Sequence, residues 1–292
     1  MPFSQEVCMN SLNVLPYEYE RWLCQCKDTL LKKHNVYDSI SGQLIRGKVL
    51  ELLDKFCIVV YYPIPEDRNN GFHITDIPFL KSEPQHFVFI NTAQTIEKQA
   101  FTAAHELGHI WKVDELVYEL SSHTVKAESE QVISRFAAIL LMPEKEFNSE
   151  AAKILNELNI NGNHIDFMNF IKLVVKLMDI FFAPYKSIII RMVELNMLTS
   201  ESAEAVLCCD EETQKEIETI INQTISDFGY VDFEKPTNKK WIDGLSSLLD
   251  EAEQNGCVSQ TKIDSIRKKF ELKKHISFER KDVFTLNTNK ES

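Results

Sequence analysis

The chain of 292 residues lacks several features that define large classes of proteins. Its first residues contain no basic segment followed by an apolar run, so we expect no secretory signal. The most apolar stretch, Phe167–Val193, is interrupted by five charged residues, which indicates core helix rather than a membrane span. The seven cysteines form no Cys-x-x-Cys pair, which favours idle thiols in a reducing compartment. These absences predict a cytoplasmic protein that does not enter a membrane.

A surplus of positive charge is also missing. The chain has 44 acidic and 32 basic residues and a net charge of −12, which argues against direct binding of nucleic acid. Between Lys262 and Lys281 the basic residues outnumber the acidic ones by eight to three. This segment is typical of a solvated helix face, and a surface that docks a partner is the second interpretation. The oligomeric state is not indicated by the sequence.

The most informative feature that is present is the pentapeptide His105-Glu-Leu-Gly-His109. On a helix the two histidines project from one face and can bind one metal ion, while Glu106 stands beside them as a base for a metal-activated water. The stretch Thr95–Trp111 has no proline, can be capped by Thr95 and has apolar residues at helical spacing, which predicts a core helix. Gly108 costs such a helix about 1 kcal/mol relative to alanine. That cost makes sense if something approaches the backbone closely at this point.

A catalytic zinc site needs a third protein ligand and leaves one position to water. The stretch Lys126–Pro143 is predicted to form a second helix that ends before its proline, and it offers Glu128 and Glu130 on opposite sides. The side of Glu130 is small or apolar throughout, with Ile133, Ser134, Ala137, Ala138 and Leu141. Such a side lets two helices approach closely, and a carboxylate that enters it is costly unless it meets a cation. We therefore predict Glu130 as the third ligand and Glu128 as a solvated carboxylate.

Two blocks of the sequence resemble a known family. They are Phe101-Thr-Ala-Ala-His-Glu-Leu-Gly-His109 and Glu130-x-x-Ile-Ser-x-Phe-Ala-Ala-Ile-Leu-Leu-Met-Pro143, which resemble the ImmA/IrrE metallo-endopeptidases of bacteria and their mobile elements. The strand Phe87–Asn91 and the segment Pro184–Arg191 are also similar to parts of that family, and the resemblance covers roughly residues 50–200. Ile133-Ser134 replaces the usual Ala-Asn, and no histidine follows shortly after the zinc helix. Ser134 could change how the outer shell of the metal is fastened.

The resemblance implies a compact gluzincin-like endopeptidase that uses Zn²⁺. Carried over residue by residue, His105, His109 and Glu130 match the metal ligands of the family, and Glu106 matches its catalytic glutamate. Family members typically act inside the cell and cut a partner transcriptional regulator, often a helix-turn-helix repressor encoded beside them. The residues alone leave two alternatives open: a non-proteolytic zinc-containing antirepressor or sensor, and an interaction protein whose metal only holds the fold.

Three details of the reaction stay open at the level of sequence. The first is the donor to the oxyanion, for which Tyr118, His123 and Tyr185 are candidates, although an ordinary loop histidine is the favoured interpretation of His123. The second is substrate alignment, since Phe87–Asn91 could be a sheet edge that pairs with an extended peptide or an ordinary core strand, and these two interpretations are compatible. The third is the metal: two imidazoles and one carboxylate favour zinc, although manganese and iron are not excluded.

The predicted fold is α+β and mostly helical, with a small β-sheet packed on a zincin-type two-helix metal site. Residues 1–200 are expected to form the peptidase domain, with a helical lead-in at 1–55, the sheet at 56–92, the zinc helices at 93–143 and closing helices at 144–200. Residues 201–292 are expected to form an additional helical region of unknown role. The other predicted elements are helices at Tyr17–Lys33, Ser41–Phe56, Glu211–Phe228 and Lys240–Gln254, strands at Cys57–Tyr62 and Phe87–Ile90, and a turn at Glu66–Gly71.

Overall fold

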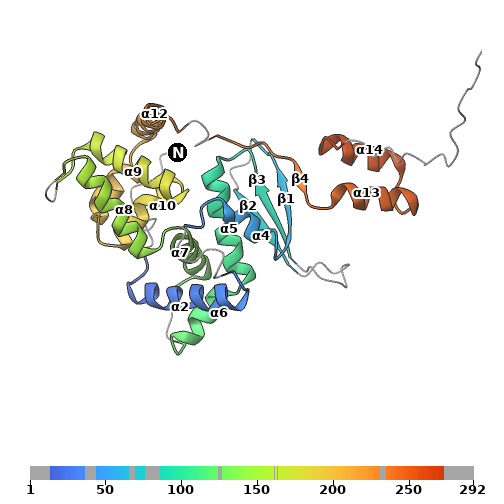
Figure 1. Cartoon of the computed structure of the whole chain (residues 1–292), viewed down its shortest axis with the longest axis horizontal. Coiled ribbons are helices and arrows are strands. Elements are labelled where there is room, and N and C mark those ends of the chain that lie inside the picture. Colours follow the sequence, from blue (N-terminus) through green and yellow to red (C-terminus); the bar gives the residue numbers. More distant parts are fainter. Residues whose placement is uncertain are drawn as a thin grey trace, which may run out of the picture. The chain divides into compact units, whose positions relative to one another are not determined.

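A computed structural model describes most of the chain and confirms the α+β, mostly helical fold class (Figure 1). The described residues are 14–36, 44–65, 70–75, 86–123, 127–160, 162, 164–230 and 235–272. The chain divides into two compact units, Met1–Lys239 and Lys240–Ser292. Within the described part, no helix combines the length and the apolar character that crossing a membrane requires.

The first unit contains a small mixed sheet and most of the helices. Its elements are α2 (Glu18–Lys33), α4 (Lys48–Leu53), β1 (Ile58–Tyr62), β2 (Gly71–Ile74), β3 (Phe87–Asn91), α5 (Ile96–Ile110), α6 (Val113–Leu120), α7 (Ser129–Leu141), α8 (Glu144–Glu157), α9 (Phe167–Phe181), α10 (Tyr185–Glu194), α11 (Ser200–Leu207) and α12 (Glu211–Asp227). The second unit has β4 (Trp241–Ile242), α13 (Leu245–Gln254) and α14 (Gln260–Lys269).

Most of the elements expected from the sequence are present, with three differences. The predicted helix at 41–56 is shorter as α4, and residues 41–43 lie outside the described part of the chain, as do residues 66–69 of the predicted turn. The predicted helix at 240–254 begins only at Leu245, because Gly244 has a left-handed backbone (φ 68°) and the two residues of β4 are extended. Strand β2 was not predicted, since a four-residue segment with glycine and histidine has little strand propensity.

The strands of the first unit lie in the order β2-β3-β1. Strands β1 and β3 run parallel, from Ile58 opposite Phe87 to Tyr62 opposite Asn91, and β2 runs antiparallel to β3. Because β3 has a partner on each side, the interpretation of Phe87–Asn91 as a sheet edge is wrong, and the core-strand interpretation is right. The buried residues of β3 agree with this position.

Helix α5 follows β3 directly and packs against the sheet. The Asn91 side chain fixes the connection: its Nδ2 donates to the Ile64 carbonyl (3.0 Å), and its Oδ1 accepts from the Ile64 and Ala93 amides (3.0 and 3.1 Å). Gly71 shows how closely β2 approaches α5. A Cβ at this glycine would lie 2.5 Å from the Phe89 carbonyl oxygen and 2.7 Å from Thr102 Cγ2. The Asn91 side chain therefore fixes the segment before α5, and the absence of a side chain at Gly71 allows β2 to lie close to this helix.

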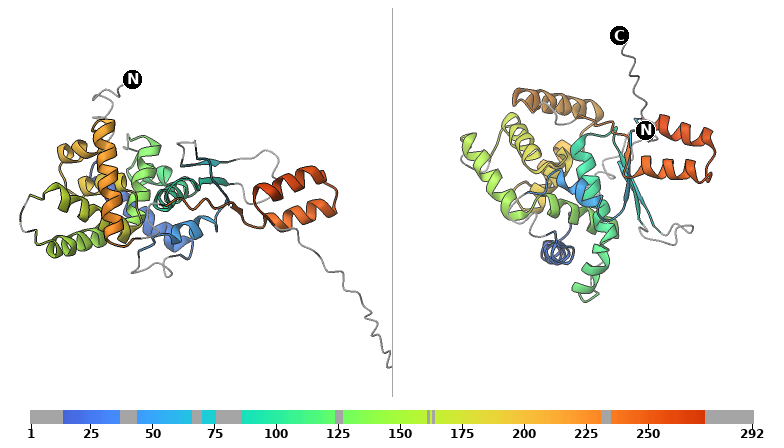
Figure 2. Two further views of the ribbon diagram at one scale, coloured as in Figure 1. Left: turned by 90° about the horizontal axis from the view of Figure 1, so that it is seen from above. Right: turned by 45° about the vertical axis from the view of Figure 1, so that its right-hand side comes forward.

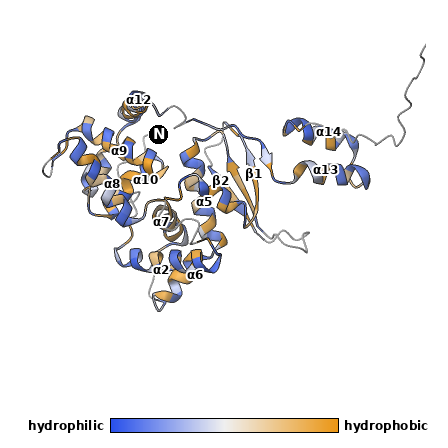
Figure 3. Ribbon diagram, in the orientation of Figure 1, coloured by the Kyte–Doolittle hydropathy of each residue, from blue (hydrophilic) through white to orange (hydrophobic). Residues whose placement is uncertain are grey.

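The helices from α8 to α12 form a second layer of the first unit (Figure 2). Helix α9 lies among them, with α8, α10 and α12 packed around it. Figure 3 shows the hydrophobic residues of these helices along their packed sides, and a largely hydrophilic α14 in the second unit. The stretch Phe167–Val193 was predicted to be core helix. It forms two helices, α9 and α10, which are joined at Phe182–Pro184.

The thiols are mostly unpaired, as expected. Cys24, Cys26, Cys57, Cys209 and Cys257 are free, and burial raises the pKa of Cys26 to about 11. A thiol with such a pKa stays protonated and unreactive at neutral pH. Cys208 is an exception: it is disulfide-bonded, so the expectation of idle thiols is wrong there. Spacing along the sequence does not reveal which distant cysteines meet in space.

Four charged side chains form a buried ion cluster that was not predicted: Glu20 of α2, Arg135 of α7, and Arg191 and Glu194 of α10. Arg191 binds Glu20 with two nitrogens (2.7 and 2.9 Å), and its Nε donates to the Met142 carbonyl (3.0 Å). Arg135 bonds Glu20 (2.9 Å) and also pairs with Glu194. The two positive and two negative charges balance, so the cluster ties α2, α7 and α10 together without a net buried charge.

The cluster is sensitive to the loss of any member. Burial by itself raises the pKa of Glu20, but Arg191 and then Arg135 hold this pKa below its ordinary value, so the carboxylate stays charged. Removing one partner of a buried ion pair leaves the other charge uncompensated, which costs about 3–5 kcal/mol.

We expect Arg191→Met to lower the free energy of unfolding by about 3–5 kcal/mol, because Glu20 and Glu194 would lose one of their two shared cationic partners and a net negative charge would stay buried. The measurement is urea denaturation followed by circular dichroism. Lys215→Met is the control, because Lys215 forms an exposed pair with Glu211 on α12, and its loss should cost less than about 1 kcal/mol. Equal effects of the two substitutions would contradict a structural role of the cluster.

Candidate metal centre

The contact between α5 and α7 is unusually close where Gly108 lies. A Cβ at Gly108 would be 3.0 Å from Ile133 Cγ2 and 3.3 Å from Phe136 Cδ1, so the side chains of α7 would have to give way to a side chain there. Gly108 predicted that some group approaches the backbone of the histidine helix closely, and this group is α7. Ile133 belongs to the small and apolar side of α7 that was predicted to face the histidine helix.

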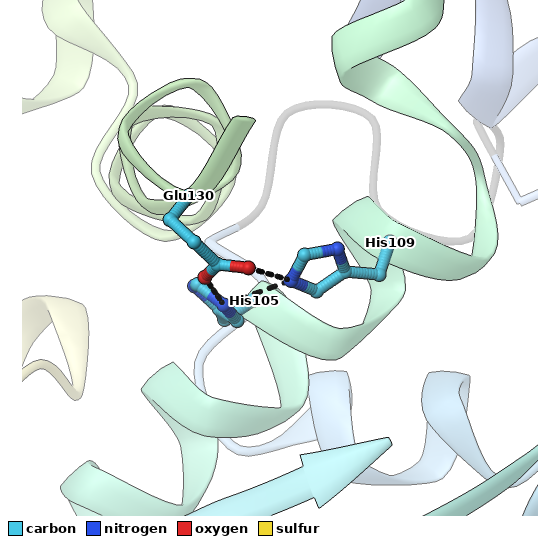
Figure 4. A group of neighbouring side chains, drawn as sticks. All are labelled: His105, His109 and Glu130. Carbon is cyan, nitrogen blue, oxygen red and sulfur yellow. Dashed lines mark hydrogen bonds and ion pairs between the residues drawn. The ribbon is translucent and has the colours of Figure 1, made fainter. Parts of the chain in front are cut away.

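The close contact brings three metal-binding groups together, as Figure 4 shows. Nε2 of His105 lies 3.2 Å from Glu130 Oε2, and Nε2 of His109 lies 3.3 Å from Glu130 Oε1. The two Nε2 atoms are 3.1 Å apart. Two turns of α5 supply the imidazoles and the first turn of α7 supplies the carboxylate. Both rings and the carboxylate point toward one another across the helix contact.

These separations suit a divalent cation. In a tetrahedral site with bonds of about 2.0 Å, neighbouring ligand atoms are separated by about 3.3 Å. The three observed distances of 3.1–3.3 Å therefore match one triangular face of such a tetrahedron. The donor set of two imidazole nitrogens and one carboxylate fits zinc, and the fourth corner would be left for water.

The prediction that Glu130 enters a buried side of the helix is wrong. The Glu130 side chain is 69% exposed, so it stands at the rim of the contact and is not forced into a buried face. The buried residues of α7 begin at Val132, two residues after Glu130. Glu128 is exposed too and precedes the helix with an extended backbone, outside the group of three.

Glu106 and Ser134 lie next to the proposed metal ligands. Glu106 is 5% exposed, and burial together with the charge of Glu130 raises its pKa to about 7. The Ser134 hydroxyl lies 3.3 Å from Nδ1 of His105. A hydrogen bond at Nδ1 leaves the Nε2 lone pair for a metal, so this serine would orient the first histidine. Burial and the neighbouring His109 lower the pKa of His105, which favours the neutral ring that a metal needs.

A second pair of histidines near the site was missed by sequence reasoning. His73 of β2 has its ring centre 6.4 Å from that of His109, and its Nε2 lies 3.0 Å from Nδ1 of His86. Burial, then His86 and His109, lower the pKa of His73 to about 4, so its ring is neutral near pH 7. The alternation of side chains along β2 could have indicated this position. Phe72 and Ile74 are exposed on one face of the strand, and the histidine between them faces the opposite side.

The three candidates for an oxyanion donor lie at two places in the fold. The rings of Tyr118 and His123 contact each other near the end of α6, with centres 4.6 Å apart. The Tyr185 hydroxyl is buried at the start of α10, without a hydrogen-bond partner in the described part of the chain. Burial raises the pKa of Tyr185, so it stays protonated. The donor to the oxyanion remains a prediction among these residues.

We expect Glu130→Ala to weaken zinc binding by more than about 100-fold, because loss of a partner in the outer shell alone costs 10–100-fold. The measurement is competition with a chromogenic chelator on protein freed of metal. Glu128→Ala is the matched control, since it removes an exposed carboxylate from the same end of α7 and should leave the affinity unchanged. Equal losses in the two variants would exclude Glu130 as a specific ligand.

One family model matches the part of the chain that contains the site. The family model of the IrrE N-terminal-like domain, peptidase family M78, matches residues 54–173, which contain both helices of the site. No curated protein matches the chain. Among solved structures, a Mycobacterium tuberculosis transcriptional regulator is similar with a TM-score of 0.40 and 15% identity, over 69% of this chain and 55% of the regulator. The chain thus spans about half the length of that protein. The match over residues 54–173 supports the resemblance of this part of the chain to the ImmA/IrrE metallopeptidases.

Proposed function

We propose that the protein is a cytoplasmic zinc-dependent endopeptidase that cleaves a partner transcriptional regulator, such as a helix-turn-helix repressor. The observation that carries the proposal is the convergence of His105, His109 and Glu130 within hydrogen-bonding distance of one another, beside the buried Glu106. In this proposal the first three residues hold zinc, and Glu106 is the catalytic base. A zinc ion held there supplies Lewis acidity, which activates water and polarises the carbonyl of the scissile bond.

Glu106 would carry the proton in both steps. It follows His105 directly on α5, so its carboxylate is adjacent to the ligand group without belonging to it. It would accept a proton from the attacking water and donate this proton to the leaving amine. Its burial excludes competing solvent from the carboxylate, which keeps the proton transfer local. Ser134 would hold the ring of His105 in place throughout the reaction.

In the part of the chain that the structure describes, β2 is an edge strand, and its outer edge would align the peptide. The Asn91 amide donates to the Asn70 carbonyl (2.8 Å), which makes residues 70 and 91 a hydrogen-bonded pair. Such pairs alternate in an antiparallel ladder, so the backbone groups of Gly71 and His73 point away from β3. An extended peptide can pair with these groups as an added strand. The ring contact between His73 and His109 would then bring the peptide close to the metal.

The resemblance to the ImmA/IrrE family supports a transcriptional regulator as the partner. The packing of the helices supports the extent of the peptidase domain. The net charge of −12 fits a protein that acts on another protein and does not bind nucleic acid itself. The ion cluster joins Glu20 and Arg191 to Arg135 of the second zinc helix. We therefore propose that the peptidase domain extends beyond the matched segment, over residues 1–200, with a helical C-terminal region at 201–292.

We expect Glu106→Gln to lower the rate of cleavage by about 10²–10⁴-fold, because the amide cannot accept the proton from water. The substrates to test are the helix-turn-helix regulators encoded beside this gene, each incubated with the purified protein and zinc and followed by mass spectrometry. The metal content should stay at one zinc per chain, because Glu106 is not a member of the ligand group.

Two outcomes would contradict the proposal. If Glu106→Gln cleaves at the rate of the unaltered chain, the carboxylate is not the base. If the variant relieves repression in cells as well as the unaltered chain does, then the protein acts by binding a regulator, as a non-proteolytic antirepressor would.

A further inference from the structure

Strand β2 presents exposed apolar side chains on the face of the sheet that is turned away from α5. A Cβ at Gly71 would lie 2.7 Å from Thr102 Cγ2 of α5, and the ring of His73 contacts His109 of the same helix, so these two positions of β2 face α5. Because side chains alternate along a strand, Phe72 and Ile74 belong to the opposite face. Their side chains are 46% and 45% exposed.

The neighbouring strand continues this apolar face. In the register of the sheet, Phe72 lies opposite Phe89, and Ile74 lies opposite Phe87. The rings of Phe72 and Phe89 stack, with their centres 5.0 Å apart. Such pairs stabilise an antiparallel sheet, because side chains that lie directly opposite each other make contact. Two rows of apolar pairs therefore end at β2, and a further strand beside β2 would extend both rows.

The backbone of β2 determines how such a strand would pair. The N–H and C=O groups of Gly71 and His73 point away from β3, because these residues are the non-hydrogen-bonded positions of the ladder between β2 and β3. If an antiparallel segment bonds to the backbone of His73, the residues on either side of the bonded one lie opposite Phe72 and Ile74 in non-hydrogen-bonded pairs. Side chains approach each other most closely in such pairs. The bonded residue itself has its side chain on the side of α5.

We propose that the outer edge of β2 selects an extended substrate segment in which two apolar residues flank one other residue. The inference rests on the proposed peptidase function and names the class of sequence that the site takes. The occupant is the substrate, because the contact of His73 with His109 places a segment on this strand next to the metal centre. An extended segment pairs with the backbone and covers Phe72 and Ile74 at once, whereas a helix on the apolar face would leave the edge unpaired.

The test uses three fluorescent peptides with the same polar flanks and the central residues Val-Thr-Val, Val-Val-Thr or Thr-Thr-Thr. Valine and threonine are both β-branched and favour strands, so the peptides differ in the amount and the spacing of apolar contact. Anisotropy measures their affinity for the zinc-loaded full chain with Glu106→Gln, which keeps the peptides intact. Val-Thr-Val should bind about tenfold more tightly than Thr-Thr-Thr, because it buries two more methyl groups. Val-Val-Thr should bind about threefold less tightly than Val-Thr-Val, since only one of its valines can face the apolar side of β2.

The variant that tests the surface is Ile74→Thr, in the same Glu106→Gln background. It removes one of the two contacts, so the preference for Val-Thr-Val over Thr-Thr-Thr should fall to about threefold. Phe72→Thr removes the other contact and should give a similar fall. Met168→Thr is the control, because Met168 is 47% exposed on α9, which packs among α8, α10 and α12, and this variant should keep the tenfold preference. The unfolding temperature of each variant shows whether its fold is kept.

Three outcomes would overturn the inference. Equal binding of the three peptides removes the apolar selection, while the metal centre and the proposed peptidase stand. If none of the peptides binds, both the selection and the alignment of a substrate on β2 are wrong, and the cleavage assay described for Glu106→Gln decides on the peptidase separately. If the full preference survives in both Ile74→Thr and Phe72→Thr, the apolar contact lies elsewhere on the protein.

Discussion

The close contact between α5 and α7 is the constraint on which the rest of the site depends. The absence of a side chain at Gly108 allows Ile133 and Phe136 to pack against the helix backbone. At this separation the carboxylate of Glu130 reaches both imidazoles, at 3.2 and 3.3 Å. A wider contact would leave the two histidines without their third partner. Glycine destabilises a helix by about 1 kcal/mol relative to alanine, and at this position it allows the close contact that the metal centre needs.

The buried ion cluster supports the same contact from the other side of α7. Arg135 is five residues after Glu130 and is bonded to Glu20 of α2 and Glu194 of α10. Helix α7 is therefore held between the histidine helix on one side and two further helices on the other. Ion clusters of this kind bring little net stability, but they demand one arrangement of their partners. In this protein that arrangement also shapes a pocket of about 400 Å³ that is lined by Glu130, Arg135 and Glu194 among others.

Local patterns in the sequence predicted the two helices of the site, the histidine pair and the position of Glu130. Periodicity and spacing are sufficient for this, because both act within one helix. What was missed depends on distant contacts: the partners of Arg135 and Arg191, and strand β2 with the approach of its His73. The position of β3 inside the sheet was left open between two interpretations. The choice of Glu130 also rested on a burial that does not exist, since its side chain is 69% exposed. The order of the strands and the burial of a residue depend on contacts between segments that are far apart in the sequence. The pattern of one segment does not reveal them.

The central claim is that His105, His109 and Glu130 hold one zinc ion and leave a corner for solvent. Zinc X-ray absorption on the purified full chain tests it most directly, because the spectrum separates nitrogen and oxygen ligands from sulfur. The account predicts four nitrogen or oxygen neighbours at about 2.0 Å, two of them with the outer-shell scattering of imidazole. A sulfur neighbour at about 2.3 Å, or the absence of an imidazole pattern, would contradict it.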